Sequence, residues 1–287
     1  MRASWIRNLR KPVRVAFQGE IGAYSESAIY EFFGSVAHPV PCKRFLDVFK
    51  RVEDGETEFG VVPVENSIEG SITQVYDLFL EHNVKVCGEV ILKIVHCLIA
   101  NPGVDLSSVR VVYSHPQALG QCRSFLERLG CELISTYDTA GSVKMIKERG
   151  LLDAAAIASE RCAEIYGMNI LAKDIADSPN NYTRFFALST FDAPPTGDDK
   201  TSIIFSTRHV PGALYKALGE FALRGINLTK IESRPTKQRP WEYNFYLDFE
   251  GHRTETRCIE ALEGLKANAL FVKILGSYPK APEKYSV

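Results

Sequence analysis

Four clusters of polar residues, each directly after a short apolar run, have the composition of a small-anion site. They span residues 18–25, 65–71, 114–119 and 138–141. Each lies where a predicted strand gives way to a predicted helix, and in parallel α/β sheets this edge faces the ligand crevice. Ser67, Ser114 and Thr139 would lie near helix N-termini, where free N–H groups favour negative charge. Such residues also cap helices without a ligand, so one cluster alone would predict little, whereas four together favour an anion site.

A fifth polar segment, residues 180–188, begins an apolar strand with Thr183 and Arg184. The planar guanidinium of Arg184 suits a substrate carboxylate, although it could equally pair with a structural carboxylate of the protein. The hydroxyl of Thr183 is a very weak acid, so a proton-donating role needs a polarising neighbour, which Arg184 could provide. The segment therefore predicts either a substrate-binding strand end or a structural ion pair.

The motifs of common cofactor and metal sites do not occur in this sequence. It has neither GxxxxGK[ST] nor a GxGxxG after a strand, its six histidines lack metal-ligand spacing, and it has no GxSxG. The seven cysteines are scattered and never spaced as CxxC, which predicts buried thiols in a reducing compartment. We therefore expect a cytoplasmic protein that uses no cofactor, metal or disulfide.

The size and charge of the chain narrow the classes of function. Its 287 residues suffice for about two domains. With 34 Lys and Arg against 35 Asp and Glu, the formal net charge is −1, so no excess basic charge serves nucleic acid or an anionic membrane. The longest apolar stretch, residues 90–100, is too short to span a bilayer. The expected partners are small molecules or further copies of the chain.

Short apolar runs alternate with helical patterns over the first 190 residues. The predicted strands are 13–18, 59–64, 109–113, 131–137 and 154–158, and the predicted helices are 24–33, 72–83, 139–148 and 159–166. One further helix is predicted from the stripe Leu119, Cys122, Phe125, Leu126 and Leu129. Parallel strands need crossover helices, so this alternation predicts an α/β fold with mostly parallel strands. The strand-rich segment 84–100 interrupts it, and the chain could cross there between two lobes.

The C-terminal part has a different pattern. Residues 191–199 contain Pro194, Pro195 and Gly197 and predict a linker. After it, strands at 201–206, 228–234, 243–249 and 271–275 combine with two helices in the order βαββαβ. This order, in about 80 residues, is the ferredoxin-like split motif. The sequence thus predicts a large α/β domain, a linker and a small α+β domain.

Taken in order, residues 65–71, 114–119 and 183–185 resemble motifs of the prephenate dehydratase family. Residues 212–214 and 232–235 resemble the phenylalanine-binding motifs of that family's ACT regulatory domain. The resemblance runs from about residue 13 to about residue 279. It implies a catalytic domain over residues 13–190, two-lobed like a type II periplasmic binding protein, with a crossing near 84–100. It further implies a linker over 191–199 and an ACT domain over 200–280.

The family reaction converts prephenate to phenylpyruvate with loss of CO2 and water, and needs no cofactor. By resemblance, Thr183 would assist departure of the ring hydroxyl, Arg184 would polarise it or hold a carboxylate, and Phe185 would orient the loop. The implied substrate-binding residues are Glu65, Asn66, Ser67, Ser114, His115, Gln117, Thr139 and Ala140. Glu65 and His115 could also act as acid or base, although a histidine before a proline is more often a hydrogen-bonded turn residue.

Two alternatives stay open at this point. Residues 139–143 carry Gly-Ser-Val where prephenate-using members are often Ala-rich, and a changed contour could favour the amino analogue arogenate, whose dehydration gives phenylalanine directly. A non-catalytic sensor of a small amino or keto acid would also suit a two-lobed fold. The combination of residues 183–185 with the four other clusters favours an enzyme.

The resemblance also implies inhibition by L-phenylalanine bound where two ACT domains meet. The implied residues are Gly212, Ala213, Leu214, Asn227, Leu228, Glu232, Ser233, Arg234 and Pro235. Gly212, at a strand-to-helix turn, would let the backbone approach a ligand closely. Such a site requires at least a dimer, and we expect a dimer of dimers. A βαββαβ unit that only dimerises is the alternative.

Overall fold

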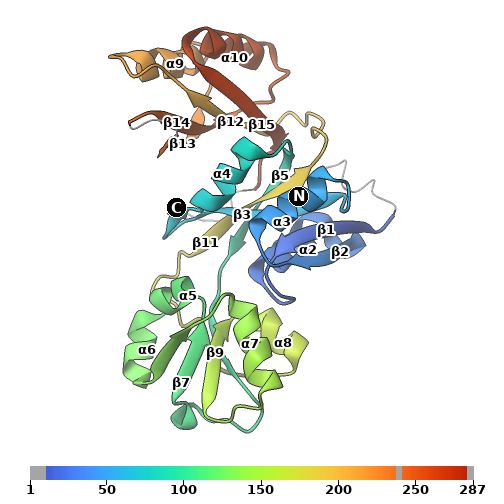
Figure 1. Cartoon of the computed structure of the whole chain (residues 1–287), viewed down its shortest axis with the longest axis vertical. Coiled ribbons are helices and arrows are strands. Elements are labelled where there is room, and N and C mark those ends of the chain that lie inside the picture. Colours follow the sequence, from blue (N-terminus) through green and yellow to red (C-terminus); the bar gives the residue numbers. More distant parts are fainter. Residues whose placement is uncertain (1–10, 237–240, 283–287) are drawn as a thin grey trace. The chain divides into compact units, whose positions relative to one another are not determined.

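The computed structural model describes residues 11–236 and 241–282, which form two compact units (Figure 1). The first unit comprises residues 11–78 and 90–185, and the second comprises residues 79–89 and the described residues from 186 onward. Two strands, β5 (Lys85–Lys93) and β11 (Tyr182–Ser189), run from one unit into the other. The first unit contains two α/β lobes, and most of the second is a four-stranded sheet with two helices.

The first lobe is built on a sheet with the strand order β2-β1-β3-β11-β5, and the short β4 pairs with β3. Its other elements are β1 (Val13–Gln18), α2 (Tyr24–Phe33), η1 (Gly34–Val36), β2 (Ala37–Cys42), α3 (Phe45–Glu53), β3 (Phe59–Asn66), β4 (Gly70–Ser71) and α4 (Thr73–Glu81). The pairs β1–β2 and β1–β3 are parallel, as the alternation of strands and helices predicts. In α3 the side chains of Val48, Phe49 and Val52 are fully buried and form its core-facing stripe.

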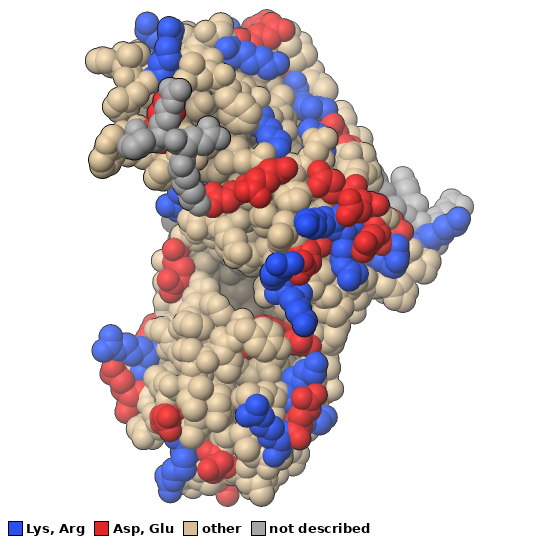
Figure 2. Space-filling model, viewed as in Figure 1, with Lys and Arg blue, Asp and Glu red and all other residues tan. Residues whose placement is uncertain are grey.

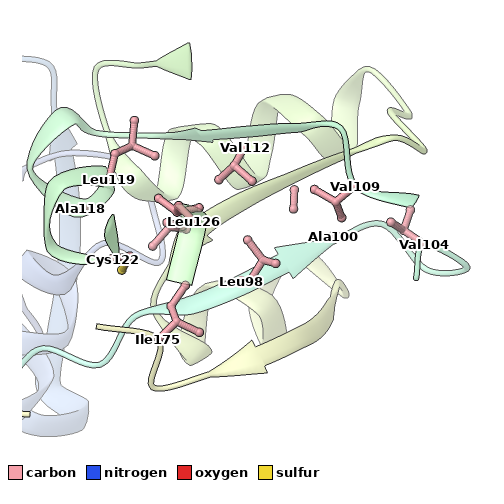
Figure 3. Packing of buried hydrophobic residues seen from close by; sticks show 12 residues of the cluster. Leu98, Ala100, Val104, Val109, Val112, Ala118, Leu119, Cys122, Leu126 and Ile175 are labelled. Carbon is pink, nitrogen blue, oxygen red and sulfur yellow. The ribbon is translucent and has the colours of Figure 1, made fainter. Parts of the chain in front are cut away.

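The second lobe has the strand order β10-β6-β9-β7-β8. Its elements are β6 (Cys97–Ala100), η2 (Leu106–Ser108), β7 (Val111–Ser114), α5 (Pro116–Gln121), α6 (Arg123–Leu129), β8 (Glu132–Ser135), α7 (Thr139–Glu148), β9 (Ala154–Ala158), α8 (Glu160–Tyr166) and β10 (Asn169–Lys173). Leu98, Val112 and Leu126, from β6, β7 and α6, meet in its apolar core (Figure 3). Burying a side chain of this size stabilises the fold by about 1.5–3 kcal/mol.

The chain passes twice between the sheets of the two lobes. It leaves the first sheet after β5 and enters the second at β6, so residues 94–96 form one crossing. It returns between β10 and β11, over residues 174–181. Two backbone hydrogen bonds join the crossings: Ile94 N–H donates to Asn181 O at 2.8 Å, and Ile175 N–H donates to His96 O at 3.1 Å. The two lobes are therefore linked by paired backbone segments.

The prediction of one helix through residues 119–129 was wrong, because the structure has two. Helix α5 ends at Gln121, and α6 starts after Cys122, whose φ of −115° and ψ of 23° break the helical path. The backbone carbonyl of Gln121 accepts a hydrogen bond from Asp177 N–H at 2.8 Å, and the Asp177 carboxylate accepts one from Ser124 N–H at 3.1 Å. The returning crossing segment therefore takes over the hydrogen bonds that a continuous helix would use.

The second unit contains the predicted βαββαβ order. Its elements are β12 (Asp199–Ser206), α9 (Ala213–Ala222), β13 (Leu228–Pro235), β14 (Tyr243–Glu250), α10 (Thr256–Asn268) and β15 (Phe271–Pro279). The strand order is β13-β14-β12-β15, its neighbouring strands are antiparallel, and both helices lie on one face of the sheet (Figure 1). Phe221 and Phe249 pack there with ring centroids 5.0 Å apart. The predicted α/β class and the ferredoxin-like unit are thus confirmed.

A buried ion pair joins two strands within this second unit. Glu89 of β5 has no exposed side-chain surface, and its carboxylate oxygen lies 3.1 Å from Lys200 Nζ of β12. The same carboxylate accepts a hydrogen bond from Ala281 N–H at 2.8 Å. A charge removed from water in this way is tolerated because it is paired and hydrogen-bonded.

Candidate active site

A cavity of about 500 Å³ lies in the first unit and is lined by residues of both lobes. Figure 2 shows the molecule hollowed between these lobes. Gln18 at the end of β1, Asn66 at the end of β3 and Thr183 at the start of β11 come from the first sheet. The helices α5 and α7 contribute from the second lobe through Gln117 and Thr139. Strand ends and helix starts of two sheets therefore converge on one space, as expected for a ligand site.

Successive residues of β11 face opposite sides, and this separates the three predicted catalytic residues. Thr183 and Phe185 line the cavity and are both buried. Arg184 between them does not line it, and its guanidinium lies 3.8 Å from the Glu65 carboxylate. Glu65 does not line the cavity either. The structure thus contains the structural ion pair that the sequence left open for Arg184, and it does not bring Arg184 or Glu65 to the cavity.

The polar neighbour of Thr183 is Asn66. Asn66 is buried, and its Oδ1 accepts hydrogen bonds from the N–H groups of Ile68 and Glu69 at 3.0 and 3.1 Å. This fixes the direction of the amide, so its Nδ2 faces Thr183 and donates to the Thr183 Oγ1 at 3.0 Å. A hydroxyl that accepts such a bond keeps its own proton for donation and becomes a stronger donor. The side chain that contacts the Thr183 hydroxyl is therefore an amide, whereas the guanidinium of Arg184 lies near Glu65.

Besides Glu65, three of the predicted substrate-binding residues lie outside the cavity lining. The fully buried Ser114 donates its hydroxyl proton to the Ile157 carbonyl at 2.7 Å. The Ser67 hydroxyl donates to Asn180 O at 2.8 Å and accepts from Tyr182 N–H at 2.9 Å, which ties the turn after β3 to the strand start at β11. Ala140 is fully buried in the first turn of α7. The hydroxyls of Ser67 and Ser114 therefore form hydrogen bonds with the backbone around the cavity.

His115, Gln117 and Thr139 do line the cavity. His115 is the N-cap of α5, and its Nδ1 accepts a hydrogen bond from Gln117 N–H at 3.3 Å. Burial lowers the pKa of His115, with a smaller opposing effect from the Asp138 carboxylate. His115 is therefore neutral near pH 7 and has the geometry of a hydrogen-bonded turn residue.

Three lining residues that were not among the predicted site residues belong to a hydrogen-bonded group across the two crossings. They are Tyr24 of α2, His96 of the first crossing and Gln121 at the end of α5. The Gln121 Oε1 lies 2.9 Å from His96 Nε2, and Tyr24 OH lies 3.1 Å from His96 Nδ1. Gln121 is only 7% exposed, and its Nε2 has no hydrogen-bond partner among the described residues. A buried amide N–H without a partner is costly unless a ligand accepts it.

Charged groups on the wall are few and of both signs. Lys43 and Arg44, just after β2, bring positive charge, although Arg44 also pairs with Asp47 at 2.7 Å. Asp138 brings a carboxylate, and burial raises its pKa although three backbone N–H groups oppose this. A ligand with two negative charges would therefore contact the cations Lys43 and Arg44 after β2, in the part of the wall that the first lobe forms.

The rim of the cavity carries contacts between the two lobes. Tyr137 lines the cavity, and its hydroxyl donates to the Glu20 carboxylate at 3.0 Å, which also pairs with Lys144 at 3.0 Å. The Tyr137 ring packs over Gly141, where a Cβ atom would lie 2.5 Å from its hydroxyl oxygen. The glycine noted in the segment 139–143 therefore leaves room for this tyrosine.

Models of two known families match the chain. One, described as prephenate dehydratase, matches residues 15–193, and the other, described as ACT domain, matches residues 201–267. The chain belongs to the prephenate dehydratase family.

Curated relatives and solved structures agree with this membership. A bifunctional chorismate mutase/prephenate dehydratase of Aquifex aeolicus is 47% identical over 96% of this chain and 75% of its own length. An arogenate dehydratase/prephenate dehydratase of Arabidopsis thaliana is 48% identical over 93% of this chain and 73% of its own. The crystal structure of prephenate dehydratase from Arthrobacter aurescens in complex with L-Phe matches with a TM-score of 0.87 and 35% identity, over 96% of this chain and 92% of that one.

Two kinds of feature are absent from the described part of this family member. No group of three or more His, Cys, Asp or Glu side chains there is placed to hold a metal ion. None of the helices found in residues 11–236 and 241–282 is long and apolar enough to cross a membrane.

Proposed function

We propose that the protein converts prephenate to phenylpyruvate, CO2 and water in the cavity between the two lobes. The observation that carries this proposal is the Thr183 hydroxyl, held in the cavity wall by the amide of Asn66 with its proton left for donation. A leaving hydroxyl group on a substrate ring needs such a donor. Membership of the prephenate dehydratase family supplies the substrate class.

The reaction needs little from the protein beyond orientation and one donated hydrogen bond. The bond between the ring carbon and its carboxylate breaks, CO2 leaves, and the electron pair enters the ring. The bond between the opposite ring carbon and its hydroxyl breaks, and the hydroxide takes a proton and leaves as water. Thr183 assists this departure, and the gain of aromaticity drives the reaction. The donated proton is replaced from solvent when the product leaves.

Two carboxylates of the substrate remain to be held. The free Nε2–H of Gln121 and the cations of Lys43 and Arg44 are the donors that the cavity offers. Arg184 contributes without contacting the substrate. Its ion pair with Glu65 joins the start of β11 to the end of β3, and these two strand ends carry Thr183 and Asn66. The roles of Ser67 and Ser114 are likewise to hold the backbone around the cavity.

Incubation with prephenate and with arogenate, at neutral pH, tests the proposed reaction directly. We expect formation of phenylpyruvate from prephenate, followed by its absorbance in alkali, at a rate well above a control without protein. Turnover of arogenate alone would assign the protein to the alternative substrate, for which Asp138 in the wall is a partner for an amino group. Binding of both compounds without turnover of either would leave the non-catalytic sensor and contradict the proposal.

We further propose that L-phenylalanine regulates the enzyme through the second unit. A cavity of about 120 Å³ there is lined by Ala213 and Leu214 of α9, next to Gly212, whose φ is 78°. Residues 227–235 of the predicted motif do not line it; β13 carries most of them and is an edge strand of the sheet. We therefore propose that the ligand site is completed in a dimer. There, the edge strand β13 of one copy would lie against the cavity beside α9 of the other copy. The Arthrobacter aurescens prephenate dehydratase, whose crystal structure is a complex with L-Phe, supports the choice of ligand.

Millimolar L-phenylalanine should lower the rate of the wild-type enzyme and change its assembly, and D-phenylalanine should do neither. Leu214→Ala should raise the concentration for half-inhibition by about tenfold, because it removes apolar contact area from the ligand. Initial rates and light scattering at several concentrations of each amino acid measure both effects. Equal responses to the two enantiomers, or none to either, would reject this regulation.

The proposal also covers how the protein assembles, where its domains begin and end, and where in the cell it is located. Self-association would use the edge strand β13 with its exposed Ile231, together with the exposed Tyr215 of α9, and we propose a dimer of dimers. We keep the catalytic domain at residues 13–190 and the regulatory domain at 200–280, with a linker between them. The seven unpaired cysteines, six of them buried, support a cytoplasmic location.

A further inference from the structure

A hydrogen-bonded chain of side chains runs through both crossings of the first unit and ends at Thr183. Asn66 Nδ2 donates to Asn181 Oδ1 at 2.8 Å, and Asn181 Nδ2 donates to Gln121 Oε1 at 2.8 Å. His96 Nε2 lies 2.9 Å from the same Gln121 Oε1. Asn181 has no exposed surface and His96 is only 3% exposed. Within this network, the Gln121 Nε2 is the group without a partner among the described residues, so its N–H is available to a ligand.

The direction of every bond in this chain follows from one fixed end. Two backbone N–H groups, from Ile68 and Glu69, donate to Asn66 Oδ1, so the Asn66 amide cannot be reversed. Asn181 must therefore present its oxygen to Asn66 and its nitrogen to Gln121. Gln121 then accepts through Oε1, which leaves its Nε2 as the free end of the amide.

His96 must match this direction. Because Gln121 Oε1 is an acceptor, the nitrogen facing it has to carry a proton, and His96 is required as the tautomer with hydrogen on Nε2. His96 Nδ1 lies 3.1 Å from the hydroxyl oxygen of Tyr24, which donates its proton to the Val95 carbonyl at 2.7 Å. Burial lowers the pKa of His96, although the hydrogen bond to Gln121 opposes this. Two donors, one from each crossing, therefore hold the same amide oxygen.

We propose that His96 and Asn181 are positioning residues, which grip the oxygen of the Gln121 amide so that its free N–H is presented to a carboxylate oxygen of the substrate. This inference rests on the proposed function for the identity of the substrate. Asn181 has a second effect, because it takes one N–H of Asn66 and leaves the other to Thr183 Oγ1, 3.0 Å from Asn66 Nδ2, and to the Tyr182 carbonyl, 3.1 Å from it. The substrate-binding amide and the catalytic hydroxyl are thus oriented by one continuous chain.

The test compares two replacements of His96. His96→Gln keeps an N–H donor near the position of Nε2, and we expect its kcat and KM to stay within about threefold of wild type, well short of a misplaced group's cost. His96→Leu removes one of the two donors that hold Gln121 Oε1, which leaves the amide held by Asn181 alone and free to shift, and should lower kcat/KM on the order of 10²-fold. Asn101→Ala is the matched control: Asn101 is also buried and makes two hydrogen bonds in the same lobe, but outside this chain. It should lower thermal stability and leave kcat/KM unchanged.

A second measurement tests the direction of these hydrogen bonds without an activity assay. Long-range ¹H–¹⁵N correlation of the wild-type histidines at neutral pH should show His96 with its proton on Nε2. An unprotonated Nε2 would overturn the proposal, as would equal kcat/KM values for His96→Gln and His96→Leu. If the wild type turns over neither prephenate nor arogenate, the proposed function fails, and the tautomer still decides whether the chain is oriented as inferred.

Discussion

Replacing Thr183 by alanine should lower kcat on prephenate by about 10²–10³-fold and leave KM within a few-fold of wild type. The reason is that the hydroxyl serves the departing group, whose charge develops only in the transition state, whereas the ground-state carboxylates are held elsewhere. In the structure the lost atom is the acceptor of the Asn66 N–H, and Asn66 keeps its bonds to Asn181 and to the turn at residues 68–69. The fold should therefore be retained.

Steady-state kinetics of Thr183→Ala and Thr183→Ser measure this prediction. Thr183→Ser keeps the hydroxyl and should retain most of the activity. A Thr183→Ala enzyme with nearly native kcat would remove Thr183 from the mechanism. A large rise in KM with unchanged kcat would instead make the hydroxyl a ground-state binding group.

Replacing Lys200 by methionine should destabilise the protein by about 3–5 kcal/mol, because it removes the cation that pairs with the buried carboxylate of Glu89 at 3.1 Å. Glu89 has no exposed side-chain surface, and Lys200 is 12% exposed. Methionine preserves the length and apolar stem of the lysine, so the loss reports the charge and not a cavity. Adding Glu89→Gln should recover part of the loss, since a neutral amide can still accept from Ala281 N–H.

Urea unfolding followed by circular dichroism, for both single variants and the double variant, measures this coupling. The control is Arg123→Met, which breaks a pair with Glu127 at 2.7 Å whose side chains are 78% and 64% exposed. It should cause no measurable change, because exposed pairs contribute little. Equal stability of Lys200→Met and wild type would show that the Glu89 charge does not need Lys200.

The sequence predicted a helix or strand correctly where its local apolar pattern matches the face that the fold buries. Strand 13–18 and helix 24–33 were predicted with the limits that β1 and α2 have. Strand β2 was not predicted, because Pro39 and Pro41 argue against a strand; the prolines are tolerated because β2 is an edge strand of its sheet.

The site was accessible in part, and the limits have physical causes. Thr183 was singled out because it stands at the start of an apolar strand, and Phe185 because of the family resemblance; both line the cavity. The same strand alternation could have shown that Arg184 faces away from them, a signal that the motif of residues 183–185 does not contain. Gln121 gave no such signal, since it lies next to an apolar helical stripe and reaches the cavity only because α5 ends there. Its partner Asn181 comes from 60 residues away, a contact that no local pattern encodes.

The break between α5 and α6 makes this part of the chain locally frustrated. Its apolar stripe favours one long helix, and the fold overrides that preference at the residue whose side chain the cavity uses. Conflicts between local preference and global fold concentrate at functional sites, where selection acts on geometry ahead of stability. Asp177 stabilises the break, because its N–H donates to Gln121 O and its carboxylate accepts from Ser124 N–H, on the two sides of Cys122. An unbroken helix would place Gln121 in its middle, whereas the observed break places Gln121 at a helix end, where it lines the cavity.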